Sequence, residues 1–536
     1  AQQSVPTPLS LLKGTENFFW REYLTGWGGE HRTDGVKRSP PDQRAPIRIS
    51  ILPHEKRPFA CMSLNRFCIL LALVSLQAVL PGVAHAQQTI STYTVGPIYG
   101  NDNSIAVTTS GTIDGTGSGA AVISTGTNTT TTFTNTSTGL ISGGNLGFLQ
   151  RGGSVDQFSN VGVITSGGYG VGFDTGAVLG TLTNSGTMTG ADKGLILAIT
   201  GTVTNLAGAV ISGTATDGLD TFGNVGLIDN AGSIYGQDRG VFIAAGSVTD
   251  LANTGSIVSI GAGLVMDTST TLGTLTNSGT IAGGGSGAVL STTGTVTNNA
   301  GGSIRGDNVD GLGLGTIGNI GRINNAGSVY GGDSGVYVAA GSVGVIDNSG
   351  TIDGGSVGLQ IVSGATLGML TNSGTVGVIL NEGTIGAGTG PAISSTGATA
   401  LIGSIINTGT INVGFQIENQ SVSVGAGIGV GVFNGGTLDV VDGDLTFTDG
   451  TITLNADVSV NGGSGTFINQ AILALADTQS VTGSFQQTSG GTTLIDLLGV
   501  TAGTYGHLSI SGAADFAGGL SLDDTLLSGG LSGGQT

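Results

Sequence analysis

The sequence predicts an all-β fold, a right-handed parallel β-helix with rungs of roughly 23 to 24 residues. Three observations indicate it. Of 536 residues, 103 are Gly and only 9% are charged, a composition typical of strands joined by many turns. A phrase beginning with Asn recurs at spacings of 21 to 27 residues from Asn184 to Asn372. Each repeat holds three short β-patterned segments with no helical period between them. Such segments cannot bury a face alone, so they must stack.

The first 86 residues differ in composition from the rest of the chain. They hold 10 of the 15 basic residues, 8 of the 10 prolines and both cysteines. Residues 1–61 are basic and rich in Pro and lack an initiator Met. A signal peptide follows them and must be N-terminal to work, so we expect 1–61 to be a disordered leader translated from upstream sequence.

Residues 62–86 have the three parts of a secretory signal peptide. Arg66 follows Met62, an apolar run of about 14 residues spans 67–80, and Ala84 and Ala86 supply the small residues before a cleavage site. The apolar run is shorter than the ~20 residues that span a bilayer. We therefore expect a signal peptide helix that is cleaved after Ala86, and no membrane span in the mature chain.

Residues 87–413 carry the repeats. The phrase is clear at Asn184-Ser-Gly-Thr-Met-Thr-Gly and at Asn277-Ser-Gly-Thr-Ile-Ala-Gly, with a looser copy at Asn407. Asn, Gly and the aliphatic residue lie at i, i+2 and i+4, so all three are predicted to point inward, with Asn stacked as a ladder at a corner. By the same parity, Ile281 and Ile352 are predicted to be inward.

The sequence also contains a longer repeat, which spans four rungs. Gly180-Thr-Leu-Thr-Asn-Ser-Gly-Thr recurs 93 residues later at Gly273 and, with one change, at Gly368. The array therefore grew by duplication of four rungs. This history favours a stackable shape over one catalytic cleft.

Beyond 413 the phrase fades into longer strand-like runs, which predict a continuation of the β-helix over 414–475. Residues 476–527 contain Gly483-Ser-Phe-Gln-Gln-Thr-Ser-Gly-Gly-Thr-Thr-Leu and Thr504-Tyr-Gly-His-Leu-Ser-Ile, and 528–536 form a Gly/Ser tail. With the signal peptide and the Asn rungs, this region resembles the passenger end of classical Gram-negative autotransporters. The resemblance covers 62 to about 527.

The resemblance implies a β-helical stalk that is exported across the inner membrane and displayed at the cell surface or released. It implies that 476–527 seeds folding of the passenger. It also implies an outer-membrane β-barrel translocator as partner. A barrel needs many alternating segments of ~10 residues. Only 528–536 follow the last strand pattern, so we expect the barrel on a separate chain or beyond residue 536.

Catalytic and metal-binding motifs are weak. Gly332-Asp-Ser334-Gly matches the nucleophile motif of chymotrypsin-like serine proteases. The equivalent segment four rungs earlier, which begins at Gly236, has no matching serine. A catalytic triad also needs a His, and the only His after residue 86 is His507. Asp307, Asp310 and the pair Asp523 and Asp524 are read as turn residues rather than calcium ligands. We expect no enzyme activity, cofactor or metal. The alternative is a β-helical carbohydrate-active enzyme, a lyase or hydrolase, although the five basic residues after residue 86 are scattered along the sequence.

Residues 87–536 hold 5 basic and 28 acidic residues, which disfavours nucleic acid as a partner. A host-surface or glycan ligand remains. Alternation predicts four outward aromatic side chains as the candidate contact surface, Tyr235, Phe242, Tyr330 and Tyr337. Arg305, Gly306 and Asp307 form an integrin-type tripeptide at a predicted strand end. Paired Thr residues, as at Thr181 and Thr183, suggest an ice-binding face, but Leu227 and Asp229 break their ladder.

Overall fold

Parallel strands stacked on three faces make up the described part of the chain. The computed structural model describes residues 88–95, 98–100, 105–107, 111–115, 117, 119–125, 129–315, 318–386, 388, 390–497 and 505–523. The leader 1–61, the signal peptide 62–86 with Ala84 and Ala86, and the tail 528–536 lie outside these residues. Contacts divide the chain at residue 81, and every described residue belongs to the second unit, Gly82–Thr536.

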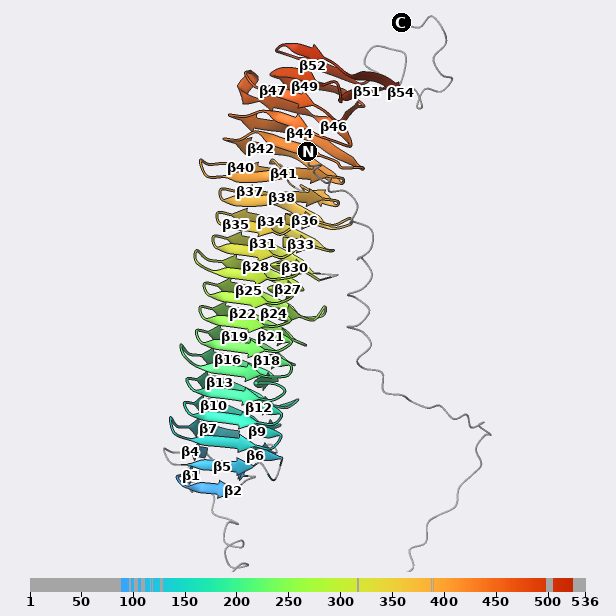
Figure 1. Ribbon diagram of the computed structural model, residues 1–536. Helices are drawn as coiled ribbons and strands as arrows, with labels where there is room; N and C mark the ends of the chain where they lie inside the picture. Colours follow the sequence, from blue (N-terminus) through green and yellow to red (C-terminus); the bar gives the residue numbers. More distant parts are fainter. Residues whose placement is uncertain are drawn as a thin grey trace, which may run out of the picture. The chain divides into compact units, whose positions relative to one another are not determined.

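The strands form one column of rungs that runs from β1 (Gln88–Ile90) to β54 (Gly519–Asp523) (Figure 1). All pairings between the strands are parallel. The expected fold class is confirmed: the chain is an all-β parallel β-helix with rungs of about 23 residues. A rung here means one turn of the helix, with one strand on each face.

The first face carries the strands that end in the Asn of the repeated phrase. In the duplicated region these strands are mostly seven residues long and pair with Asn opposite Asn. Their bounds are β1 (Gln88–Ile90), β4 (Ile105–Val107), β7 (Thr129–Asn135), β10 (Ser154–Asn160), β13 (Val178–Asn184), β16 (Ile199–Asn205), β19 (Val225–Asn230), β22 (Ser247–Asn253), β25 (Thr271–Asn277), β28 (Thr292–Asn298), β31 (Asn319–Asn325), β34 (Ser342–Asn348) and β37 (Thr366–Asn372).

The second face carries the short strands that complete the Asn phrase. Their aliphatic residues point inward, as Ile234 and Ile281 do. Their bounds are β2 (Tyr93–Val95), β5 (Thr112–Gly115), β8 (Leu140–Gly143), β11 (Val163–Ser166), β14 (Thr187–Gly190), β17 (Val210–Gly213), β20 (Ser233–Gly236), β23 (Ser256–Ser259), β26 (Thr280–Gly283), β29 (Ser303–Gly306), β32 (Ser328–Gly331) and β35 (Thr351–Gly354).

The third face carries the segments that begin near a Gly and alternate apolar residues. Val241 and Ile243 are buried here, with Phe242 between them facing outward. The bounds are β3 (Ile98–Gly100), β6 (Ala120–Thr125), β9 (Leu146–Arg151), β12 (Tyr169–Phe173), β15 (Leu195–Leu197), β18 (Asp217–Thr221), β21 (Arg239–Ile243), β24 (Ala262–Met266), β27 (Ala288–Leu290), β30 (Leu312–Leu314), β33 (Ser334–Val338) and β36 (Val357–Ile361).

The rung changes its architecture at β38 (Thr375–Asn381), which pairs with both β35 and β36. The second and third faces merge there into one longer strand. The remaining elements are β39 (Thr384–Ile385), β40 (Ile393–Ser395), β41 (Leu401–Asn407), β42 (Thr410–Glu418), β43 (Val422–Gly425), β44 (Val430–Val441), β45 (Leu445–Phe447), β46 (Thr451–Val460), η1 (Asn461–Gly463), β47 (Thr466–Asn469), β48 (Ile472–Leu475), β49 (Thr478–Thr482), β50 (Ser484–Gln487), β51 (Thr492–Asp496), β52 (His507–Ile510), β53 (Ala514–Phe516) and β54 (Gly519–Asp523).

One continuous core fills the column. Inward side chains stack on their equivalents in the next rung, as Leu182 does on Val203, and both are fully buried. Aromatic rings continue the stack toward each end: Phe133 and Phe158 lie 4.5 Å apart between ring centroids, and Phe467 and Phe485 lie 5.4 Å apart. Because each rung covers the one before it, burial is shared along the whole array.

Buried asparagines form the predicted ladder at one corner. Each side-chain Nδ2 donates to Oδ1 of the Asn in the next rung, over 2.7–2.9 Å, and to a backbone carbonyl oxygen of that rung. The ladder ends where Asn372 donates to the Ser395 hydroxyl. Its members are Asn135, Asn160, Asn184, Asn205, Asn230, Asn253, Asn277, Asn298, Asn325, Asn348 and Asn372.

Asn407 does not continue this ladder. It accepts from Asn381 in a second ladder, at the end of the merged strands. Asn381 lies in register with Ile361. The first acceptor of each ladder, Oδ1 of Asn135 and of Asn381, has no hydrogen-bond partner among the described residues.

The Gly of the Asn phrase lies at the corner; it is buried, as the parity predicts, in some rungs, as at Gly232, and half-buried in others, as at Gly186. A Cβ on Gly186 would lie 2.1 Å from the carbonyl oxygen of Gly162 in the preceding rung. Likewise, a Cβ on Gly190 would lie 1.9 Å from the carbonyl oxygen of Lys193. Close approach of the backbone therefore requires glycine at both ends of the second-face strand.

The Asn253→Ala variant is expected to lower the free energy of unfolding by about 2–4 kcal/mol. The change removes the donor to Oδ1 of Asn277 and the acceptor of Asn230 Nδ2. Unfolding in guanidinium chloride measures the loss. The matched control is Thr254→Ala, at the next, exposed residue. Equal stability of the two variants would show that the ladder contributes nothing.

Candidate functional site

The four predicted aromatic side chains lie on the outer wall of the helix. Tyr235 and Phe242 belong to β20 and β21, and Tyr330 and Tyr337 belong to β32 and β33. All four are half-buried, while their inward neighbours such as Ile234 are fully buried. The predicted parity is therefore confirmed.

Strand register places the two pairs four rungs apart. Tyr235 is followed in its outward column by Val258, Ala282, Arg305 and Tyr330. The column of Phe242 reaches Tyr337 in the same four steps. At about 4.8 Å per rung the pairs are about 19 Å apart.

Arginine side chains cover part of this aromatic surface. The guanidinium carbon of Arg239 lies 3.7 Å from the ring centroid of Phe242, and that of Arg305 lies 5.0 Å from Tyr330. Cation–π contacts of this kind stabilise both partners by about 0.5–1 kcal/mol at exposed sites. The wall thus presents arginine–aromatic pairs rather than bare rings.

The integrin-type tripeptide is at the end of β29, as predicted. Arg305 and Asp307 are each 54% exposed, and Arg305 Nε lies 2.5 Å from Asp307 Oδ1. Gly306 is buried, and a Cβ there would lie 2.1 Å from the carbonyl oxygen of Asp310. The two side chains form an ion pair with each other, so a receptor that binds both side chains must first break this ion pair.

A buried ion cluster lies at the start of the third face. Arg239 Nε donates to Asp217 Oδ1 at 2.8 Å, and Lys193 Nζ lies 3.4 Å from Asp217 Oδ2. Lys193 also pairs with Asp220. Both aspartate side chains are fully buried, whereas Lys193 is 17% exposed and Arg239 23%. Lys193 and Arg239 come from different rungs, as expected, but strand register brings both to Asp217, so these two basic residues are clustered in space.

Burial and charge attraction have opposite effects on the pKa values within the cluster. Burial raises the pKa of Asp220, and the hydrogen bond from Lys193 and its charge limit the rise. Burial lowers the pKa of Lys193, but Asp220 and Asp217 outweigh it, so the Lys193 pKa is raised overall. Lys193 therefore stays charged, and with Arg239 it lies against acids that have no access to water.

The four-rung duplication places a second acid at the equivalent position. Asp310 corresponds to Asp217, and Ser286 and Ser334 stand where the first copy has Lys193 and Arg239. Asp310 is 8% exposed. Burial, with repulsion from Asp333, raises the pKa of Asp310 to about 7, although the backbone N–H of Ser334 opposes the rise.

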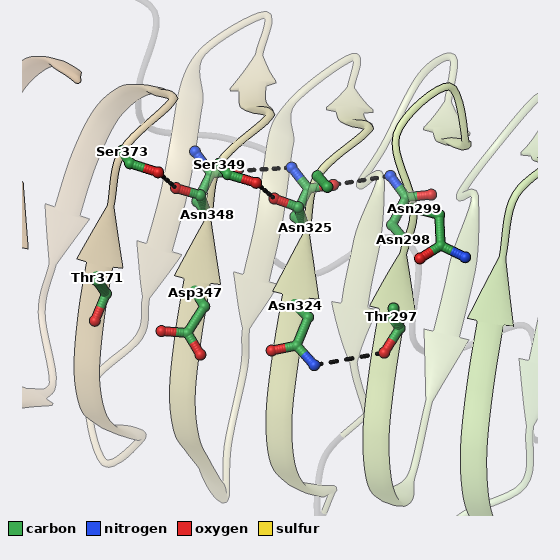
Figure 2. A pocket seen from close by; sticks show the side chains of 11 residues that line it. Thr297, Asn298, Asn299, Asn324, Asn325, Asp347, Asn348, Ser349, Thr371 and Ser373 are labelled. Atoms are coloured by element: carbon green, nitrogen blue, oxygen red, sulfur yellow. Dashed lines mark hydrogen bonds between the residues drawn. The ribbon is translucent and has the colours of Figure 1, made fainter. Parts of the chain in front are cut away.

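The first face is hollowed near the Asn ladder (Figure 2). The hollow has about 310 Å³ and is bounded by the outward column Thr297, Asn324, Asp347 and Thr371 and by corner residues such as Ser349. Arg322 donates to Asn324 Oδ1 at 2.8 Å and pairs with Asp347. Most of the lining is neutral and hydrogen-bonding, which suits hydroxyl groups. The hollow could not be predicted from the sequence, because its residues come from separate rungs.

The serine and histidine of the protease-like candidate lie apart, and the calcium candidates Asp307 and Asp310, between β29 and β30, lie far along the column from Asp523 in β54 (Figure 1). Ser334 is fully buried, and its hydroxyl donates to Gln360 Oε1 at 3.1 Å. His507 belongs to β52, many rungs from β33 (Figure 1). Asp523 is at the last described strand, and Asp524 lies outside the described residues. Within the described ranges no three His, Cys, Asp or Glu side chains gather as metal ligands.

The Thr pairs lie in outward columns of the first face. Thr181 and Thr202 are neighbours there, but Leu227 and Asp250 follow them before Thr274 resumes the column. The predicted break in the ladder is confirmed, so the wall offers no continuous Thr face.

No protein-family model, curated protein or solved structure matches this chain. In the part of the chain that the structure describes, no helix has the length and apolarity to cross a membrane.

Proposed function

We propose that this chain is an exported β-helical passenger of autotransporter type that acts at the surface of a Gram-negative bacterium or after release from it. Its role is adhesive and structural rather than catalytic. The signal peptide pattern of 62–86 and the absence of Cys after residue 86 support export. The partner for secretion is an outer-membrane β-barrel translocator.

The observation that carries the adhesive role is the repeated outer wall. Two aromatic pairs recur four rungs apart in the same two columns. Aromatic faces bind the apolar faces of sugar rings, and the neutral polar hollow on the first face suits sugar hydroxyls. A rigid column that repeats its contacts can engage a glycan at several points, and such contacts add through effective concentration.

Replacement of all four outward aromatic residues by Ser is expected to abolish adhesion to host-surface glycans. These residues are Tyr235, Phe242, Tyr330 and Tyr337. The side chains point outward, so the β circular dichroism spectrum is expected to stay unchanged. Binding of the full chain to a glycan array measures the effect. The control replaces Val258 and Val265, outward in the same columns, by Ser.

Undiminished binding by the four-residue variant would contradict the proposal. Release of unsaturated or reducing sugar ends by the purified chain would contradict it in another way, because it would indicate a carbohydrate-active enzyme.

A further inference from the structure

We propose that Asp310 anchors a binding site for a guanidinium group, supplied by an arginine side chain of a partner protein. The inference goes beyond the proposed function, since it holds whether or not the wall mediates adhesion. Its basis is a comparison of the two copies of one site inside the same column.

The first copy shows what the acid binds. Asp217 is fully buried, accepts a hydrogen bond from Arg239 Nε at 2.8 Å and has Lys193 Nζ at 3.4 Å. The guanidinium carbon of Arg239 lies over the ring of Phe242, 3.7 Å from its centroid and three residues further along β21. Planar stacking together with a carboxylate contact is the arrangement that arginine favours over lysine.

The second copy keeps the acid and the ring and lacks the cations. Asp310 takes the place of Asp217, and Tyr337 takes that of Phe242 in the same outward column. Ser334 stands where Arg239 would be, and its hydroxyl is directed to Gln360. No cation pairs with Asp310 in the described ranges of the chain.

The carboxylate lies against a position that has no side chain. Gly313 stands where the first copy has Asp220, and a Cβ there would lie 3.2 Å from Asp310 Oδ2, so no second acid competes for a cation beside Asp310. Three side chains of the first copy, those of Lys193, Asp220 and Arg239, are thus reduced to Ser, Gly and Ser in the second. Asp310 itself is 8% exposed, and the Arg239 side chain that binds the first copy's acid is 23% exposed, so a cation at this position lies near the surface.

The surroundings favour a cation. Asp333 is exposed on the adjoining turn and Asp353 follows Tyr330 in its column. The nearby cation, Arg305, already pairs with Asp307. A buried acid retained without its cations is costly, and an incoming guanidinium would restore the pair seen in the first copy.

The test titrates acetyl-arginine amide into the full chain at pH 8 by calorimetry, with acetyl-citrulline amide as the uncharged probe of the same shape. We expect binding of the arginine probe only. Asp310→Asn, a change of equal size, is expected to weaken binding more than about tenfold. Asp333→Asn, at an exposed neighbour, is expected to weaken it less than about threefold.

Ser334→Arg tests occupancy directly. The new side chain corresponds to Arg239 and is expected to fill the site and abolish binding of the probe. Acidification is expected to weaken binding as Asp310 becomes protonated. The other titratable groups around the site are Asp307, Asp333, Asp353, Arg305, Tyr330 and Tyr337. Failure of the wild-type chain to bind, equal binding by Asp310→Asn, or equal binding of the citrulline probe would overturn the proposal.

Discussion

Replacement of Ile281 by Asp is expected to lower the local free energy of unfolding by about 4–5 kcal/mol or more. Ile281 is fully buried in β26, between Ile257 and Ile304 of the neighbouring rungs. A carboxylate there would lose its hydration and would face only apolar side chains in its column. The methyl contacts on both sides would be lost as well.

The matched control is Ala282→Asp, one residue along the same strand. Ala282 faces outward, half-exposed, between Val258 and Arg305. Its carboxylate stays in water next to a cation, so the expected change is within about 0.5 kcal/mol. Both variants introduce the same charge into the same strand, one on the inward face and one on the outward face.

Amide hydrogen exchange is the suitable measurement, because a solenoid can open locally. Protection in β23, β26 and β29 is expected to fall in Ile281→Asp, with less change in distant rungs such as those around β46. Equal protection in the two variants would mean that Ile281 is not a core residue. Ile352→Asp, at another fully buried position, would repeat the test.

The rung could be predicted because its determinants are local. The Asn phrase places an inward amide, a glycine and an inward aliphatic residue at fixed offsets, and the backbone approach at Gly186 explains why glycine recurs. Spacing between successive Asn residues then fixes the length of each rung. The inward positions of Ile281 and Ile352 and the outward position of Tyr235 follow from alternation alone.

The change of architecture at β38 could not be predicted, because two successive segments both match the strand that ends in the ladder Asn. Thr366-Leu-Gly-Met-Leu-Thr-Asn and Thr375-Val-Gly-Val-Ile-Leu-Asn both end in Asn, and only Ser373 and Gly374 separate them. Either could extend the ladder from Asn348. Only the pairing of β38 with β35 and β36 shows that the second phrase crosses to the merged faces and starts a new ladder with Asn407.

Prediction of the ion cluster requires the register between neighbouring strands as well as the sequence pattern. Lys193, Asp217 and Arg239 are distant in sequence, yet each immediately precedes the Gly of a third-face segment. Aligning the residues at that position would have shown the acid between two cations, and the acid between two serines at Asp310. The burial of these side chains is not visible in the sequence, because outward positions are ordinarily exposed.

The Asp310→Asn variant is expected to stabilise the rungs around β30 at pH 8, by an amount on the order of 3–4 kcal/mol relative to its effect at pH 4. The pKa of Asp310 is raised to about 7, above the 3.8 of a free Asp. The folded chain therefore holds a proton that the unfolded chain releases between those values. The stabilisation of the folded chain by protonation of Asp310 is fully present below about pH 4 and is lost as the pH rises through 7.

The wild-type chain is accordingly expected to lose local stability between pH 4 and pH 7 more steeply than Asp310→Asn. Hydrogen exchange in β29, β30 and β33, compared between the two chains at each pH, isolates this group from other acids such as Asp220. Asp333→Asn is expected to give a smaller gain at pH 8, since it removes repulsion but leaves the buried carboxylate. A difference between wild type and Asp310→Asn that does not change with pH would show that Asp310 does not titrate in this range.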